Sequence, residues 1–184
     1  MKNLLCILCL CLYTITFSSC GEDADASSGM LEGTWTAEDI TSEVETTTQA
    51  SGETFSVTSS LSSLALDYDL TFEETTFTTS GSYTFEVVSK FSDTTSVTSE
   101  ESKSNVSGSG SYSVDGMKLT IDGALYKLDD VNQQQTATTG PQIVDFVIND
   151  AGDLVMTNSD TQEINQGGLA YSLKVTSRSV WKRK

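Results

Sequence analysis

Carboxylates and hydroxyls are the side chains in this sequence that could do chemistry, because other reactive groups are missing or confined to the N-terminus. The chain of 184 residues has no His, and its four Cys all lie at or before Cys20. A Ser-His-Asp triad and a His-ligated metal are therefore excluded. No Gly-rich phosphate loop stands between a strand and a helix. We expect no enzymatic activity and no cofactor.

Acidic residues are the next candidates for a site. Asp67, Asp69, Glu73 and Glu74 could form a patch for divalent ions or a cationic partner, or they could line a solvated outer wall. They have strand spacing, whereas calcium needs about six to eight oxygens that converge on one point. The loop at residues 149–153, Asn-Asp-Ala-Gly-Asp, lacks the later Glu of an EF-hand. It predicts a hairpin turn rather than a metal site.

The charge balance limits the class of partner. The chain carries 26 acidic and 10 basic residues, for a formal net charge of −16. Between Cys20 and Glu101 the only basic residue is Lys90. A nucleic acid would be repelled by this surface, so we expect no nucleic-acid partner. A basic protein partner stays open.

The N-terminus has the features of an export signal. Lys2 is followed by an apolar run from Leu4 to Leu12 and then by the exit segment Phe17-Ser18-Ser19-Cys20. The run is too short for a membrane-spanning helix, which needs about 20 apolar residues. We predict a signal peptide at residues 1–19, and a mature chain that can form no internal disulfide.

Ser18-Ser19-Cys20 resembles the lipobox of bacterial lipoproteins, although Phe17 stands where that family usually has Leu, Val or Ile. The resemblance implies lipidation of Cys20 with several acyl chains such as palmitate, and anchoring in the outer membrane of a bacterial cell envelope. Residues 20–30 are small and acidic, which predicts a flexible tether. This acidic cluster also resembles the surface-export signal of Bacteroidota lipoproteins, so surface exposure and membrane leaflet stay open.

The rest of the chain alternates apolar and polar residues with the period of a strand. Leu66, Tyr68, Leu70 and Phe72 share one face, and the alternation from Phe77 to Phe91 predicts one long strand. Further strands are expected at residues 34–48, 55–62, 94–102, 142–149, 153–158 and 169–181. Residues 100–111, rich in Ser and Gly, are expected to fray.

Two Asp-Gly pairs predict a three-stranded meander. Asp-Gly favours a two-residue hairpin turn, which would place Val114 opposite Met117 and Ile121 opposite Ala124. In total, about 8–10 antiparallel strands at hairpin spacing predict an all-β sandwich or up-and-down barrel.

Three features resemble lipocalin-like lipoproteins of the Bacteroidota type. They are the Gly-x-Trp entry at residues 31–35, the meander at residues 110–121, and Arg178 on the last strand. The resemblance covers residues 31–184 and implies an antiparallel up-and-down lipocalin-like β-barrel. It also implies that Arg178 packs over Trp35 to close one barrel end. Alternation with Leu173 and Val175 instead turns Arg178 outward. The charged side chains of Lys182, Arg183 and Lys184 are expected to lie in solvent.

The resulting function hypothesis is non-catalytic binding of a small hydrophobic ligand in the barrel mouth. The candidate lining residues are Trp35, Tyr83, Phe85, Tyr112 and Leu119. The alternative for these side chains is that they fill the barrel core. The second function hypothesis is an envelope protein–protein interaction or inhibitor module, whose acidic surface meets a basic partner.

Overall fold

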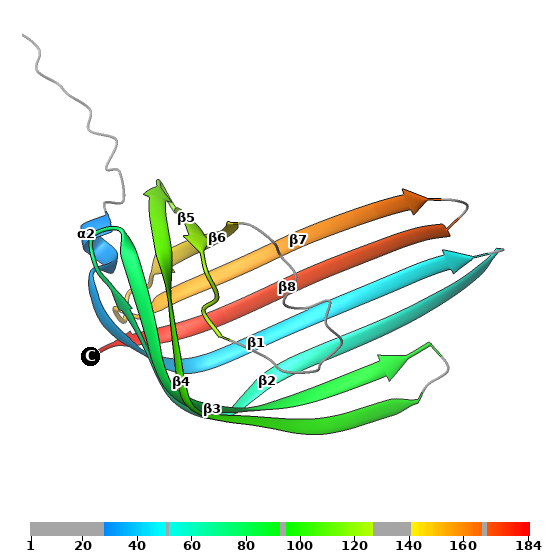
Figure 1. Cartoon of the computed structure of the whole chain (residues 1–184), viewed down its shortest axis with the longest axis horizontal. Helices are drawn as coiled ribbons and strands as arrows, with labels where there is room; N and C mark the ends of the chain where they lie inside the picture. The colour runs from blue at the N-terminus through cyan, green and yellow to red at the C-terminus, as the bar shows by residue number, and fades with distance from the viewer. Residues whose placement is uncertain (1–27, 51, 93–94, 127–140, 167–168) are drawn as a thin grey trace, which may run out of the picture.

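The computed structural model is an all-β protein with one short helical turn before the first strand (Figure 1). It describes residues 28–50, 52–92, 95–126, 141–166 and 169–184. The predicted signal peptide and Cys20 lie outside these ranges, as does the predicted tether apart from residues 28–30. The elements are α2 (Ser28–Leu31), β1 (Gly33–Ala50), β2 (Glu53–Phe72), β3 (Thr76–Phe91), β4 (Ser96–Asp115), β5 (Lys118–Asp122), β6 (Gln142–Ile148), β7 (Leu154–Gln166) and β8 (Leu169–Arg183).

The eight strands form one antiparallel sheet that closes into a ring. Each strand pairs with the next along the chain, and β8 pairs with β1. This is an up-and-down, barrel-like arrangement, and it confirms the all-β antiparallel prediction at the lower end of the expected strand number. Across the described ranges, no helix is long and apolar enough to span a membrane.

The ring is narrow at one end and opens at the other. β5 and β6 have 5 and 7 residues, whereas β1, β2 and β4 have 18 to 20. β5 therefore pairs with β4 only from Ser111 to Asp115, and β6 pairs with β7 only from Leu154 to Thr157. Figure 1 shows the remaining long strands extending away from this closed end.

A belt of β-bulges separates the two parts. The register shifts between Ala37 and Asp39 in β1 and between Ser63 and Ala65 in β2. It shifts again where β3 and β4 pass Gly81 and Val106. Bulges bend strands and increase twist, which accounts for the sharp turn of β2, β3 and β4 in Figure 1. We call the strands beyond this belt the flared half: residues 40–50, 53–62, 83–91, 96–103, 158–166 and 169–179.

Each bulge also changes which residues face inward. In β2, the buried Leu61 is at an odd position, whereas Tyr68, Leu70 and Phe72 are at even positions. A bulge adds one residue and so shifts the period-two pattern by one. In the sequence this change resembles the end of one strand and the start of another. The prediction of separate strands within β2, and of another pair within β4, was wrong for this reason.

Residues 100–111 were expected to fray, and the structure contradicts this. They belong to β4 and pair with β3 as far as Ser111. Asn105 lies in a left-handed conformation, with φ of 54°, so the polar Ser and Gly stretch contains the bulge of an otherwise continuous strand.

The predicted meander registers were also wrong. The first turn consists of Gly116 and Met117, so Val114 faces Leu119 instead of Met117. Only Gly116, with φ of 58°, has a positive φ in this turn, which matches a type II′ hairpin. At the second Asp-Gly pair, Ile121 faces Gln142 of β6 instead of Ala124.

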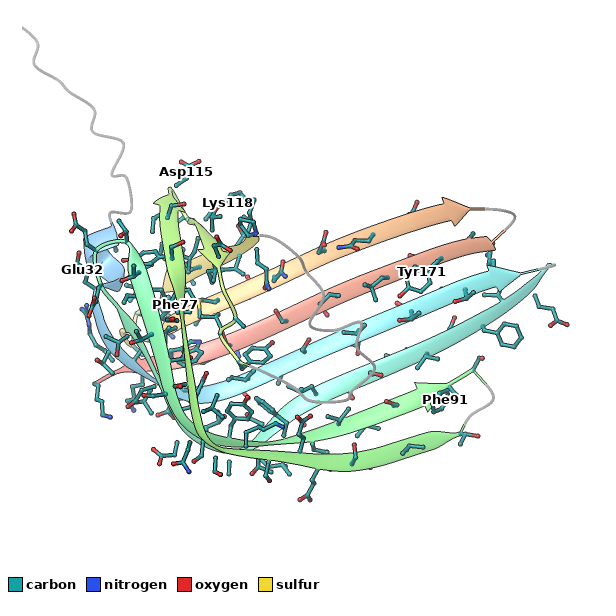
Figure 2. The ribbon with its side chains drawn as sticks, viewed as in Figure 1. Glu32, Phe77, Phe91, Asp115, Lys118 and Tyr171 are labelled. Atoms are coloured by element: carbon teal, nitrogen blue, oxygen red, sulfur yellow. The ribbon has the colours of Figure 1, made fainter. Side chains whose placement is uncertain are left out.

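Aromatic side chains fill the closed end. Phe72 and Phe77 are almost fully buried, and Figure 2 shows Phe77 inside this part of the molecule. The Phe72 ring makes an edge contact with Tyr112, with centroids 4.8 Å apart. Burial of a large apolar side chain contributes about 1.5–3 kcal/mol. The closed end is therefore the part of the ring that holds most of the aromatic core.

The C-terminal residues seal this end over Trp35. The Trp35 side chain is fully buried, and its indole N–H donates to the carbonyl of Leu31 at 2.8 Å. The Arg183 guanidinium lies 5.0 Å from the centre of the Trp35 ring and donates to the carbonyl of Glu32. A cation over an indole face is a favourable contact. The chain therefore closes this end with Arg183, whereas the resemblance implied Arg178.

Arg178 faces outward, as its alternation with Leu173 and Val175 indicated. Its guanidinium pairs with Asp39 at 3.3 Å on the outer surface. The two residues between Ala37 and Ile40 contain the bulge of β1, and this bulge does not turn Arg178 toward Trp35.

Asp69 ties the C-terminus to the outer surface of the sheet. Its carboxylate accepts hydrogen bonds from Lys184 Nζ at 2.8 Å and from the Thr36 hydroxyl at 2.7 Å. The bond from Lys184 is the main reason why the pKa of Asp69 is lower than its ordinary value, and the Thr36 bond adds to the effect. Lys184 was expected to lie free in solvent, so this contact corrects that expectation.

We predict that Asp69→Asn lowers the free energy of unfolding by about 1 kcal/mol at neutral pH, a value reduced by the partial exposure of the pair. Because the folded state lowers the pKa of Asp69, this contribution is present above the ordinary value of 3.8. It is lost as the pH falls through the folded-state pKa. Urea unfolding of both proteins from pH 7 to pH 2 measures the difference.

Asp145→Asn is the matched control. Asp145 pairs with Lys118 at 3.0 Å, but both side chains are well exposed, so this substitution should change stability little. A gap between wild type and Asp69→Asn that stays constant down to pH 2 would contradict the assigned role.

Candidate functional site

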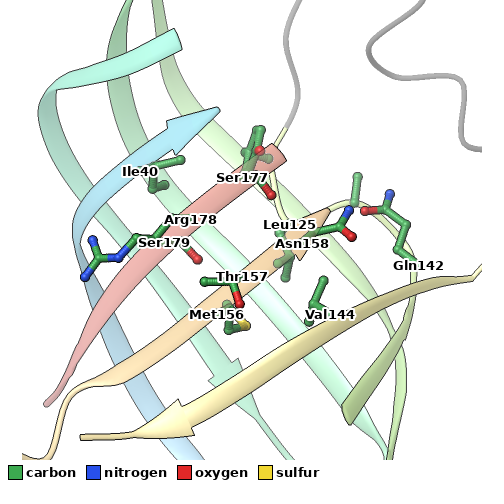
Figure 3. Close-up of a pocket in the computed structure, with 12 residues that line it drawn as sticks. Ile40, Leu125, Gln142, Val144, Met156, Thr157, Asn158, Ser177, Arg178 and Ser179 are labelled. Carbon is green, nitrogen blue, oxygen red and sulfur yellow. The ribbon is translucent and has the colours of Figure 1, made fainter. Parts of the chain in front are cut away.

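A cavity of about 130 Å³ lies where β6 separates from β7 (Figure 3). The last paired residues at this fork are Asp145 of β6 and Thr157 of β7. Beyond them the two strands diverge, and the space between them opens toward the flared half. The cavity therefore results from the short length of β6.

Strands on both sides of the fork supply the walls. Ile40 and Met156 are buried at the base, and Val144 closes the side of β6. Polar groups lie nearer the opening, where Figure 3 shows Gln142, Asn158 and Ser177 on different strands. The complete lining is Ile40, Ala124, Leu125, Tyr126, Gln142, Val144, Met156, Thr157, Asn158, Ser177, Arg178 and Ser179.

The cavity wall presents no charged group to its interior in the described part of the chain. Arg178 is its only ionisable basic residue, and its guanidinium is directed outward to Asp39, away from the other lining side chains (Figure 3). The remaining polar groups are amides, hydroxyls and the Tyr126 phenol. Burial raises the pKa of that phenol, with a smaller effect from Tyr83, so Tyr126 is neutral at physiological pH. Such a wall suits an uncharged apolar group.

Ser179 connects the cavity wall to the core. The buried indole N–H of Trp181 donates to the Ser179 hydroxyl at 2.8 Å. Trp181 in turn packs near Tyr68, with ring centres 6.2 Å apart. The Tyr68 hydroxyl donates to the carbonyl of Leu125 at 2.7 Å. These hydrogen bonds hold Ser179 and Leu125, which both line the cavity, in place. Burial keeps the pKa of Tyr68 above its ordinary value.

The inner face of the flared half continues from the cavity. On β1 and β8, Val44 and Val175 face each other across the pair. On β2 and β3, Leu61 and Val87 do the same, and both are almost fully buried. Near the strand tips the inward apolar residues are exposed, namely Phe55, Phe91 and Val97. Figure 2 shows Phe91 and Tyr171 on these extended strands.

The five residues predicted to bind a ligand lie in the core. Trp35, Tyr83, Phe85, Tyr112 and Leu119 are at most 6% exposed and belong to one buried cluster. The rings of Tyr83 and Phe85 lie 4.9 Å apart. None of the five lines the cavity at the fork. Their positions match the alternative in which they fill the barrel core.

The acidic residues and the loop at residues 149–153 form no metal centre. Within the described ranges, no group of three or more Asp, Glu, His or Cys side chains is placed to hold an ion. In the loop, the Asn149 side-chain oxygen accepts the backbone N–H groups of Ala151 and Asp153, both at 2.9 Å. The loop is therefore the hairpin turn that the sequence predicts.

Sequence reasoning missed the residues that line the cavity. Val144 and Met156 belong to two of the predicted strands, and the structure buries both side chains. A pattern along one strand cannot indicate where two neighbouring strands separate. Ile40 and Ser179 come together with Met156 only through the register of β8 with β1 and β7.

Comparisons with known proteins add no relative: no family model, no curated protein and no solved structure matches this chain.

We predict that Ser179→Ala lowers the free energy of unfolding by about 1–3 kcal/mol, because the buried indole N–H of Trp181 loses its acceptor. The neighbouring inward residue Ser177 provides the control. Ser177→Ala removes a partly exposed hydroxyl and should change stability by less than about 0.5 kcal/mol. Thermal and urea unfolding followed by tryptophan fluorescence measure both effects, and equal losses would contradict the role of Ser179.

Proposed function

We propose that this protein is a non-catalytic lipoprotein of the bacterial outer membrane, with a lipocalin-like barrel that binds a small hydrophobic ligand. The main observation in favour is the neutral cavity at the fork of β6 and β7, which opens onto an apolar inner sheet face. Concave, mostly apolar sites with a few polar groups are typical of small-molecule binding.

The size of the cavity limits what it can hold. Ligand pockets for whole drug-sized molecules have about 300–1,000 Å³, whereas this cavity has about 130 Å³. An engineered cavity of about 150 Å³ holds a single benzene. We infer that one ring or a short alkyl group occupies the cavity, and that the rest of the ligand extends toward the strand tips, where the inward apolar residues of the flared half are exposed.

The residue inventory supports a non-catalytic role. Catalysis needs a nucleophile or base positioned beside a reacting group. The cavity wall offers amides and hydroxyls from Gln142, Asn158 and Ser177, and no imidazole occurs in the sequence. These groups can orient a ligand by hydrogen bonding.

The proposed location rests on the N-terminal sequence. A leader with one charge, an apolar run and Ser18-Ser19-Cys20 match a lipoprotein signal. With more than one acyl chain on Cys20, anchoring is stable without a membrane-spanning helix. The acidic stretch that follows would hold the ring away from the membrane surface.

We predict that the apolar dye Nile red binds the protein saturably, and that Ser177→Phe weakens this binding at least about fivefold. A phenyl ring at Ser177 would occupy much of a cavity that holds about one benzene. Thr176→Phe, on the adjacent outward position, is the matched control and should bind the dye as the wild type does. Fluorescence titration decides: equal binding by both variants would place the dye elsewhere, and no binding by the wild type would contradict the proposal.

We also predict that Cys20→Ala abolishes acylation and releases the protein from the membrane fraction. The free energy of unfolding should stay unchanged, because Cys20 lies thirteen residues before the first strand and exposed sites contribute little. Detergent phase partitioning measures the release. A variant that remains in the detergent phase, or a wild-type mature protein that starts at another residue, would contradict the lipid anchor.

A further inference from the structure

β7 has a long free edge beyond the fork. β6 pairs with β7 as far as Thr157, and from Asn158 to Gln166 the strand pairs only with β8 within the described residues. This edge is nine residues long, about 30 Å at the usual rise per residue. Alternate backbone N–H and C=O groups on such an edge point away from the sheet and can pair with another extended chain.

The other free edge of the flared half belongs to β4, and it differs from the β7 edge. β4 is interrupted by the bulge at Asn105, which has a φ of 54°. Natural proteins use bulges and lysines to block edge pairing, and β4 also carries Lys103 on its inner face. The β7 edge has an unbroken register with β8 from Leu154 to Gln166. It contains neither Lys nor Pro.

Acidic side chains determine which chain can pair with this edge. Asp160 and Glu163 are exposed, and neither makes an ion pair in the described structure. Asp160 shares the inward face with Asn158, whereas Glu163 is on the outward face, because side chains alternate along a strand. An incoming strand therefore meets one carboxylate on each of its two faces.

A second copy of this protein fits the edge poorly. Pairing two β7 edges would bring the carboxylates of both copies together, and each chain already carries a net charge of −16. Like charges opposite each other in a sheet are destabilising. An extended segment with basic residues gains attraction at the same positions.

We propose that the β7 edge, residues 158–166, binds an extended basic peptide segment of a partner protein by strand addition. The segment continues the path that β6 leaves at the fork, so it runs antiparallel to β7. Backbone hydrogen bonds supply the pairing, and basic side chains opposite Asp160 and Glu163 supply the selectivity. This surface is the backbone edge of the sheet, so the inference does not require a small ligand in the cavity.

The test uses the full-length protein in detergent micelles and a fluorescent nine-residue peptide of Thr and Val. Lys stands at its fourth and seventh positions, which lie opposite Glu163 and Asp160 in the antiparallel register. We expect saturable binding by fluorescence anisotropy, and slower hydrogen exchange at backbone amides of residues 158–166.

Asp160→Lys with Glu163→Lys should weaken binding about tenfold or more. The same peptide with Glu in place of Lys should then bind this variant better than it binds the wild type.

Glu43→Lys with Glu53→Lys is the matched control, because it changes the net charge equally at exposed positions of β1 and β2. It should leave peptide binding nearly unchanged at physiological salt, where separated surface charges are screened. A peptide of the same sequence with alternate backbone amides methylated should not bind.

Three results would overturn the proposal. The first is absence of saturable binding by the basic peptide. The second is equal binding by the methylated peptide, which would show charge attraction without strand addition. The third is self-association of the wild type that slows hydrogen exchange at backbone amides of residues 158–166 in the absence of peptide, because the edge would then serve a second copy.

Discussion

The short length of β5 and β6 is the constraint on which the rest of the structure depends. Every other strand is long enough to cross both the closed end and the flared half, but these two reach only the closed end. The hydrogen-bonded ring can therefore be complete at one end only. The cavity at the fork, the apolar inner face and the free β7 edge all follow from the place where the ring stops being continuous.

The closed end compensates for this incomplete ring with dense packing and a sealed base. Trp35 and Trp181 are fully buried there, and each indole N–H has an acceptor within 2.8 Å. A buried polar group without a partner would cost about 1–3 kcal/mol. Arg183 covers the Trp35 ring from outside, so the C-terminal strand both completes the ring of strands and protects a fully buried side chain from water.

The flared half is built differently, with fewer aromatic residues and many Ser and Thr side chains. Ser59 and Ser89 bond to each other at 3.0 Å on its inner face, and the hydroxyls of Thr84 and Ser102 bond at 2.9 Å on its outer face. Cross-strand hydroxyl pairs add about 0.2–1 kcal/mol each. A six-stranded sheet held in this way, with an apolar side that is exposed near the strand tips, is a suitable surface for binding.

The sequence by itself determined the all-β class, the inward position of Trp35 and the hairpin at Asn149, because these depend on local alternation and turn chemistry. It also indicated that Arg178 faces outward. The tertiary structure decided the continuity of β2 through its bulge, because a one-residue insertion changes the phase of the pattern without ending the strand. It also decided that Arg183 covers Trp35 and that β6 leaves β7 at Thr157. Both depend on pairing between segments distant in the chain, and no local pattern records that pairing.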